Sequence, residues 1–241
     1  MINHKVPYKY NGNDYEGMLV FDDTVTEKRP GVFMQPDWLG VCSHTVEMAT
    51  QAAEKDYVIM MADMFGKNYG GMKKSNDELG KVARSKRANI EFILGCGKAA
   101  DAALTHEANQ LGLIKTSKKG AIGYCMGGGF VLEQIRSGAN FDGTVLFHVT
   151  LPSTVAPDRK NKISGRILVI HGSDDIVTPK AQIDALETEL SMNKVNWQVM
   201  MFGNAEHSFC VPNANDELQR YDEKLCHQSY RLMRDFFQET L

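Results

Sequence analysis

The segment Gly123-Tyr124-Cys125-Met126-Gly127 places a thiol between glycines at fixed distances on both sides. An apolar strand pattern precedes the cysteine and a helical pattern follows it, which is typical of a sharp turn that exposes a nucleophile. Small residues are needed two positions before and after the nucleophile because the backbone passes close on both sides. We therefore predict that Cys125 is a nucleophile at a helix N-terminus, where the helix dipole favours a thiolate. In the alternative interpretation, Cys125 is a small buried residue and the glycines only allow close packing.

A nucleophile of this kind requires an acid and a base, and the usual chain order is nucleophile, acid, histidine. The apolar strand pattern at 166–170 is followed by a loop with two adjacent aspartates. Asp175 is the predicted acid because it lies three residues beyond Gly172, and Asp174 is the neighbour with which it could be confused. The alternative is that an aspartate here only caps the helix predicted to begin near Pro179.

The predicted base is His207, which follows the last strand pattern at 197–201. A loop histidine alone is usually a surface residue, so the argument depends on the order of the three signals along the chain. Each of the three lies at the carboxyl end of a predicted strand, where working groups gather in parallel sheets. His171 is the rival histidine, but its position directly at a strand end favours a packing role.

The rest of the chain supplies the elements that position these residues. Two short strands at 4–10 and 15–20, separated by turn residues, predict an N-terminal β-hairpin. Apolar and amphipathic patterns then alternate, which predicts an α/β fold with a mostly parallel central sheet and helices on both faces. We expect a single domain over residues 1–241. The predicted strands are 31–35, 57–61, 120–124, 143–148, 166–170 and 197–201.

The predicted helices follow from apolar periodicity and from the residues that start or break helices. Two closely spaced glycines at Gly95-Cys96-Gly97 destabilise a helix and predict a break there. The predicted helices are 43–55, much of 77–112, a helix after Met126, a helix after Pro179, and 216–241.

The motifs resemble those of the dienelactone hydrolase family over essentially the whole chain. Gly-Tyr-Cys-Met-Gly-Gly at 123–128 resembles the family's Gly-Tyr-Cys-Phe-Gly-Gly. The segment Asp-Trp-Leu-Gly at 37–40 is similar to its Glu-Trp-Trp-Gly, and Asp-Met-Phe-Gly at 63–66 is similar to its Asp-Leu-Tyr-Gly. The resemblance implies the α/β-hydrolase fold and a cysteine-dependent hydrolase.

The resemblance also implies roles for further residues. The family has a glutamate that pairs with the cysteine in the resting enzyme, and Asp37 takes that position here with a side chain one methylene shorter. The backbone amides of Met126 and Trp38 are then the implied oxyanion donors. As alternatives, Asp37 is a turn former after a proline and Trp38 a core or cleft-wall residue.

One departure from the family concerns the substrate. Members that cleave dienelactone place an arginine four residues after the catalytic histidine, where it binds a substrate carboxylate. Here that position is Val211, which argues against dienelactone itself. Arg84 and Arg87, in a predicted helix, are candidates to supply positive charge.

Composition restricts the binding partners, the location and the cysteine chemistry that we expect. The formal net charge is −3, which suggests no nucleic-acid or membrane partner. No apolar run approaches a membrane span, and the N-terminus lacks an apolar signal core, so a cytoplasmic location is expected. Five cysteines without short paired spacings predict neither a disulfide framework nor a metal site. By their loop positions, Cys42 and Cys210 are expected near the same cleft as Cys125.

These observations predict hydrolysis of a small ester, lactone or thioester through an acyl-enzyme, with no metal or organic cofactor. One alternative is a cysteine enzyme of the glutamine-amidotransferase or DJ-1-like type, but those folds generally lack an acid between nucleophile and histidine. Another is a catalytically dormant binding protein that retains the fold.

Overall fold

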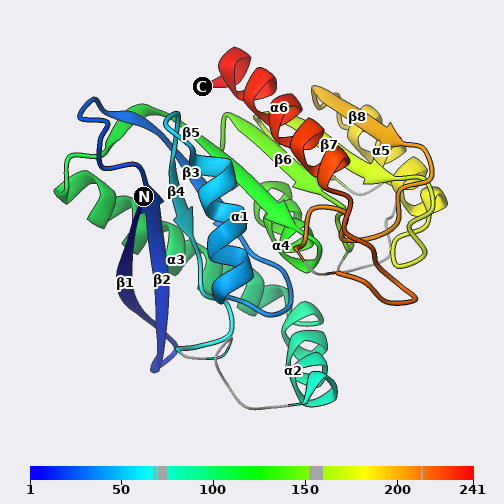
Figure 1. Cartoon of the computed structure of the whole chain (residues 1–241), viewed down its shortest axis with the longest axis horizontal. Coiled ribbons are helices and arrows are strands. Elements are labelled where there is room, and N and C mark those ends of the chain that lie inside the picture. Colours follow the sequence, from blue (N-terminus) through cyan, green and yellow to red (C-terminus); the bar gives the residue numbers. More distant parts are fainter. Residues whose placement is uncertain (68, 70–74, 152–159, 213) are drawn as a thin grey trace.

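The computed structural model of the chain describes residues 1–67, 69, 75–151, 160–212 and 214–241. Within these residues, eight strands form one sheet in the order β1-β2-β4-β3-β5-β6-β7-β8 (Figure 1). The strands are β1 (Ile2–Tyr10), β2 (Asn13–Phe21), β3 (Arg29–Gln35), β4 (Val58–Met61), β5 (Ile114–Tyr124), β6 (Gly143–Phe147), β7 (Arg166–Gly172) and β8 (Trp197–Phe202).

The direction of pairing divides the sheet into two parts. β1 and β2 form an antiparallel hairpin, and β2 pairs antiparallel with β4. All pairs from β4 through β3 to β8 are parallel, so their carboxyl ends meet at one edge. The predicted N-terminal hairpin and mostly parallel sheet are confirmed.

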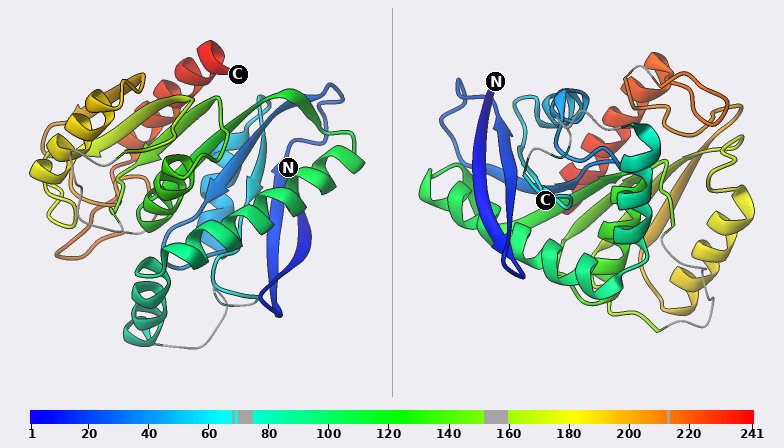
Figure 2. Two further views of the ribbon diagram at one scale, coloured as in Figure 1. Left: turned by 180° about the vertical axis from the view of Figure 1, so that it is seen from behind. Right: turned by 90° about the horizontal axis from the view of Figure 1, so that it is seen from below.

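Helices cover both faces of the sheet, as in Figures 1 and 2. α1 and α6 lie on one face, where Met48 and Tyr230 pack with one set of strand side chains. α3, α4 and α5 lie on the other face, where Ile93, Val131 and Ile183 belong to a second apolar cluster. The helices are α1 (Ser43–Ala53), α2 (Asn76–Arg87), α3 (Ile90–Gln110), α4 (Met126–Arg136), α5 (Lys180–Met192) and α6 (Glu223–Thr240). No helix of the described residues is long and apolar enough to cross a membrane.

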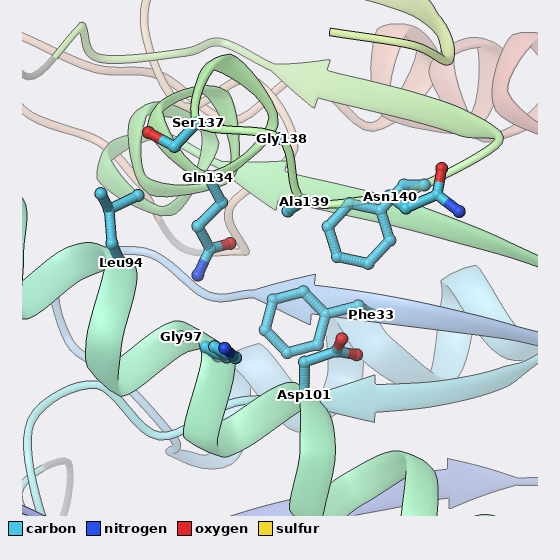
Figure 3. A pocket seen from close by; sticks show the side chains of 11 residues that line it. Phe33, Leu94, Gly97, Asp101, Gln134, Ser137, Gly138, Ala139 and Asn140 are labelled. Atoms are coloured by element: carbon cyan, nitrogen blue, oxygen red, sulfur yellow. The ribbon is translucent and has the colours of Figure 1, made fainter. Parts of the chain in front are cut away.

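The predicted helix break at Gly95 and Gly97 is wrong, because both glycines lie inside α3. The break comes earlier, at Asn89, whose side chain caps α3. The glycines instead admit side chains from other elements. A Cβ on Gly95 would lie 2.2 Å from the Tyr10 hydroxyl, and one on Gly97 would lie 1.4 Å from Gln134 Nε2. Figure 3 shows Gln134 extending from α4 toward Gly97 at the edge of a cavity between α3 and α4.

Two element boundaries also differ from the prediction. β5 begins at Ile114 rather than near residue 120, since its first two residues pair with the start of β3. α6 begins at Glu223 rather than near residue 216, because Asp222 caps it and accepts a hydrogen bond from the backbone of Leu225 at 2.9 Å. The segment before Asp222 forms two isolated bridges instead of a helical turn.

A disulfide joins Cys210 to Cys226, with Cα atoms 4.7 Å apart. The prediction that the cysteines form no disulfide framework is therefore wrong for this pair. Cys210 lies in the loop after β8 and Cys226 in the first turn of α6. Their proximity depends on how α6 packs against the sheet, which the spacing of 16 residues does not reveal.

Candidate active site

Cys125 occupies a sharp turn between β5 and α4. Its backbone has φ 52° and ψ −120°, a strained conformation for a residue with a side chain. The neighbouring glycines make the turn possible. A Cβ on Gly127 would lie 2.1 Å from the Pro36 carbonyl oxygen, and one on Gly123 would lie 2.6 Å from the Gly128 Cα. The turn thus needs glycine at both positions, and it places Cys125 at the N-terminus of α4.

The structure brings Cys125, His207 and Asp175 together, although 82 residues separate the first two. His207 Nε2 lies 3.1 Å from Cys125 Sγ, and His207 Nδ1 lies 2.7 Å from Asp175 Oδ2. The other carboxylate oxygen, Oδ1, accepts hydrogen bonds from the backbone N–H groups of Val177 and Thr178 at 2.9 and 2.8 Å. All three residues are at least nine-tenths buried.

Asp174, the other candidate acid, points elsewhere. Its side chain is exposed and accepts a hydrogen bond from the Ser173 hydroxyl at 2.7 Å. His171, the rival histidine, is fully buried and donates from Nε2 to the Thr178 carbonyl oxygen at 2.8 Å. Burial lowers the pKa of His171, so this imidazole stays neutral behind Asp175.

Electrostatics at His207 favour its charged form. Burial alone lowers the pKa of an imidazole. A negative charge on Cys125 and the hydrogen bond to Asp175 act in the opposite direction and raise this pKa. Together they raise the pKa of His207 to about 10. An imidazolium between two acids can hold a thiolate ready for attack and later deliver a proton to a leaving group.

Cys125 and His207 border a cavity of about 420 Å³, which is large enough for a small organic molecule. Trp38 and Met126 both border this cavity beside Cys125. Met126 is the first residue of α4, and the first amides of a helix have no partner within it. Both Arg84 and Arg87 of α2 reach the cavity, whereas Val211 does not line it.

A family model settles the relationship of this chain to known proteins. The model of the dienelactone hydrolase family matches residues 16–241. The chain belongs to the dienelactone hydrolase family. It is a member whose hairpin, parallel sheet and strand-to-helix turn follow the α/β-hydrolase fold.

Individual relatives of this dienelactone hydrolase family member agree with the family match. A putative carboxymethylenebutenolidase from Synechocystis sp. is 23% identical over 223 residues, which cover 88% of this chain and 87% of the relative. The solved structure of a dienelactone hydrolase-like promiscuous phosphotriesterase from metagenomic libraries has a TM-score of 0.87 and 29% identity, covering 99% of this chain and 98% of that one. A putative dienelactone hydrolase from Klebsiella pneumoniae shares the fold, with a TM-score of 0.77 at 14% identity and coverage of 99% and 98%.

The structure gives Asp37 a different partner from the one that the family resemblance implied. Its Oδ1 accepts a hydrogen bond from the Leu39 backbone at 2.9 Å, and its Oδ2 lies 2.6 Å from His44 Nε2. Among the described residues, the side-chain partners of the Cys125 sulfur are His207 and Thr150. The shorter side chain of Asp37 folds back onto its own loop, so the expected resting-state contact with the nucleophile is absent in this structure.

Sequence reasoning missed Thr150, whose hydroxyl lies 3.4 Å from Cys125 Sγ and 3.5 Å from His207 Nε2. It follows the carboxyl end of β6, an edge position that the strand-end rule could have indicated. His148, from the same segment, packs edge-on against His207 with ring centroids 5.4 Å apart. Burial lowers the pKa of His148, which favours the neutral form of this ring.

Proposed function

We propose that this protein hydrolyses a small carboxylic ester, lactone or thioester through Cys125, His207 and Asp175. The observation that carries the proposal is the continuous contact from the thiol to Nε2 at 3.1 Å and from Nδ1 to the carboxylate at 2.7 Å. Membership of a hydrolase family supports the reaction class.

In the proposed reaction, His207 takes the thiol proton and Cys125 attacks the carbonyl carbon. The tetrahedral intermediate collapses to a thioester on Cys125, and His207 protonates the leaving oxygen or sulfur. His207 then activates a water molecule that hydrolyses the thioester and regenerates the thiol. Asp175 holds the imidazole in the required orientation and stabilises its positive charge.

The oxyanion is proposed to bind the backbone amides of Met126 and Trp38. Two features support the assignment: both residues border the cavity beside the nucleophile, and Met126 begins α4. The positive end of the α4 dipole stabilises negative charge at this point.

The cavity favours a substrate that carries an anionic group. Arg87 is half-buried and donates to the Leu151 carbonyl oxygen, which fixes its guanidinium at the cavity wall. Arg84 adds a second positive charge from the exposed side of α2. These arginines offset the loss of the family arginine at Val211, and they reach the substrate from another element.

The two alternative functions differ from this proposal in testable ways. Glutamine-amidotransferase and DJ-1-like folds generally lack an acid between the nucleophile and the histidine in chain order. His207 here contacts Asp175, which lies between Cys125 and His207 in the chain, at 2.7 Å, and this order argues against them. A dormant binding protein would retain the cavity but turn over no ester.

The deciding experiment is hydrolysis of a short-chain p-nitrophenyl ester by the wild type and by Cys125→Ala and Cys125→Ser. We expect measurable turnover by the wild type and a loss of at least ~1000-fold in both variants. An inert wild type, or a Cys125→Ala variant that keeps its rate, would reject the thiol-hydrolase proposal. A phosphotriester belongs in the same panel because the metagenomic relative is named for that activity.

The substrate charge is tested by comparing a neutral ester with one that carries a carboxylate. Arg87→Met is expected to raise KM for the anionic ester by about 10-fold or more and to leave the neutral ester nearly unchanged. Arg231→Met, which changes an exposed arginine on α6, is the matched control. Equal effects on both esters would contradict the anionic-substrate proposal.

A cytoplasmic location is also a proposal, and the disulfide makes it worth testing. Disulfides such as Cys210–Cys226 are rare in reducing compartments. Fractionation of cells, with alkylation of free thiols during lysis, reports both the location of the protein and the state of this pair.

A further inference from the structure

A second Cys-His-Asp cluster, formed by Asp37 and Cys42 of the segment between β3 and α1 and by His44 of the first turn of α1, lies outside the proposed active site. Cys42 Sγ lies 3.0 Å from His44 Nδ1, and His44 Nε2 lies 2.6 Å from Asp37 Oδ2. The corresponding distances in the first triad are 3.1 and 2.7 Å. The imidazole therefore joins a thiol to a carboxylate in both clusters, although the two ring nitrogens exchange roles.

Cys42 also occupies the N-cap of α1. The backbone N–H of Thr45 donates to its sulfur, and the Thr45 hydroxyl accepts a hydrogen bond from the Cys42 backbone at 2.9 Å. The sulfur thus receives a helix N–H and faces the positive end of the α1 dipole, two features that stabilise a thiolate.

The thiol is accessible from a cavity other than that of Cys125. Cys42 is partly exposed and lines a cavity of about 440 Å³. Lys5 and Glu16 border this cavity, and their side chains pair at 2.7 Å. The expectation that Cys42 shares a cleft with Cys125 is wrong, because Cys42 does not line the cavity of Cys125.

Charge within the cluster favours the ionised form of the sulfur. Burial tends to raise the pKa of the Cys42 thiol, but the hydrogen bond and positive charge of His44, with the Thr45 amide, lower it below its ordinary value. For His44, burial is opposed by the hydrogen bonds to Asp37 and Cys42, and its pKa is raised to about 10. Asp37 therefore supports the imidazolium that in turn stabilises the thiolate.

We propose that Cys42 is a second reactive thiol, which undergoes exchange with low-molecular-weight disulfides. The Cys42 thiolate attacks one sulfur of a disulfide R–S–S–R, a new S–S bond forms between Cys42 and that sulfur, and R–S⁻ leaves with the electron pair of the broken bond. The disulfide is the oxidant. The step needs no oxyanion donors, only an accessible thiolate, and the cluster supplies one.

The test measures the reaction of dithiodipyridine with the full-length Cys125→Ser protein at about pH 6, where an ordinary thiol is well below ~1% thiolate. In this background the free thiols are Cys42 and Cys96, and Cys96 is fully buried. Glutathione is the reference thiol, and Cys42→Ser in the same background shows which signal belongs to Cys42. Peptide mass analysis identifies the modified residue.

We expect Cys42 to react faster than glutathione, by about 3-fold for each unit by which its pKa is lower, because the thiolate fraction rises 10-fold while nucleophilicity falls about 3-fold. His44→Asn should remove most of this advantage, and Asp37→Asn should remove part of it, with the native fold verified by circular dichroism. A Cys42 rate at or below that of glutathione overturns the proposal, as does an unchanged rate in folded His44→Asn. If His44→Asn does not fold, the comparison of Cys42 with glutathione decides alone.

Discussion

Replacing Asp175 with asparagine tests the triad at the contact that fixes the tautomer of its histidine. In the native site, Oδ1 of Asp175 accepts two backbone N–H groups, from Val177 and Thr178, and Oδ2 faces His207 Nδ1. An asparagine must keep its oxygen toward the two N–H donors, since the opposite orientation would place donors against donors and lose both bonds. Its NH₂ group is therefore directed at His207.

This orientation decides which nitrogen of His207 carries the proton. Nδ1 must accept from the NH₂ group, so Nε2 carries the proton and points it at Cys125, and the imidazole cannot take the thiol proton. A serine triad loses about 10⁴-fold from the equivalent change. A thiol ionises more readily than a hydroxyl, so we expect kcat to fall by about 10² to 10⁴, or ~2.7–5.5 kcal/mol in activation free energy.

The assay is steady-state hydrolysis of the p-nitrophenyl ester, with thermal unfolding as a measure of the fold. The matched control is Asp174→Asn, because Asp174 is adjacent in sequence but exposed and bonded to Ser173. We expect this control to keep its rate within about 2-fold. Near-wild-type activity of Asp175→Asn, or equal losses in the two variants, would refute the assignment of Asp175 as the triad acid.

Three further predictions concern the turn, the core and the base. Gly127→Ala should abolish soluble, active protein because its Cβ would lie 2.1 Å from a backbone oxygen, whereas Gly203→Ala meets nothing within 4 Å and should melt normally. Arg136→Met should destabilise the protein by about 3–5 kcal/mol in chemical unfolding, since it removes the guanidinium that pairs with the buried carboxylates of Glu133 and Glu189. Lys81→Met at an exposed pair should cost less than ~1 kcal/mol. NMR titration of His207 should give a pKa well above 6.5 that falls when the neighbouring thiol is replaced by alanine.

The His207 prediction has a consequence for stability against pH. The folded-state pKa of His207 is raised to about 10 from an unfolded value near 6.5, so the charged imidazole stabilises the fold fully below about pH 6.5. This contribution is lost as pH rises toward 10. A stability curve that stays flat over this range in the wild type, or that falls equally in Cys125→Ala, would contradict the charge assignment.

The parallel sheet could be predicted because its inner strands, such as β4 and β6, are continuous apolar runs, and strands buried on both faces require such runs. The proximity of Cys125, Asp175 and His207 to one another could be predicted from their positions after strand ends, where the fold brings distant segments together. The match to the dienelactone hydrolase family over residues 16–241 confirms the resemblance read from the motifs.

The features that were missed depend on side-chain packing rather than on local pattern. Gly97 looks like a helix breaker in sequence, but a Gln134 side chain from α4 fills the space where a Cβ would lie. Asp37 pairs with the Leu39 backbone and His44 rather than with Cys125, a choice among nearby partners that the sequence pattern does not encode. The pairing of Cys210 with Cys226 depends on how α6 docks, a long-range contact that spacing does not encode.

The complete burial of α4 has a consequence for how this protein could acquire new activities. All eleven residues of the helix that follows Cys125 are buried, so a substitution there disturbs packing before it can alter the cavity. α2 has only three buried residues, yet it contributes Arg84 and Arg87 to the cavity wall. Variation on α2 can therefore change substrate preference while the reactive turn stays intact, and a mutant library aimed at α2 should yield far more folded, catalytically competent variants than one aimed at α4.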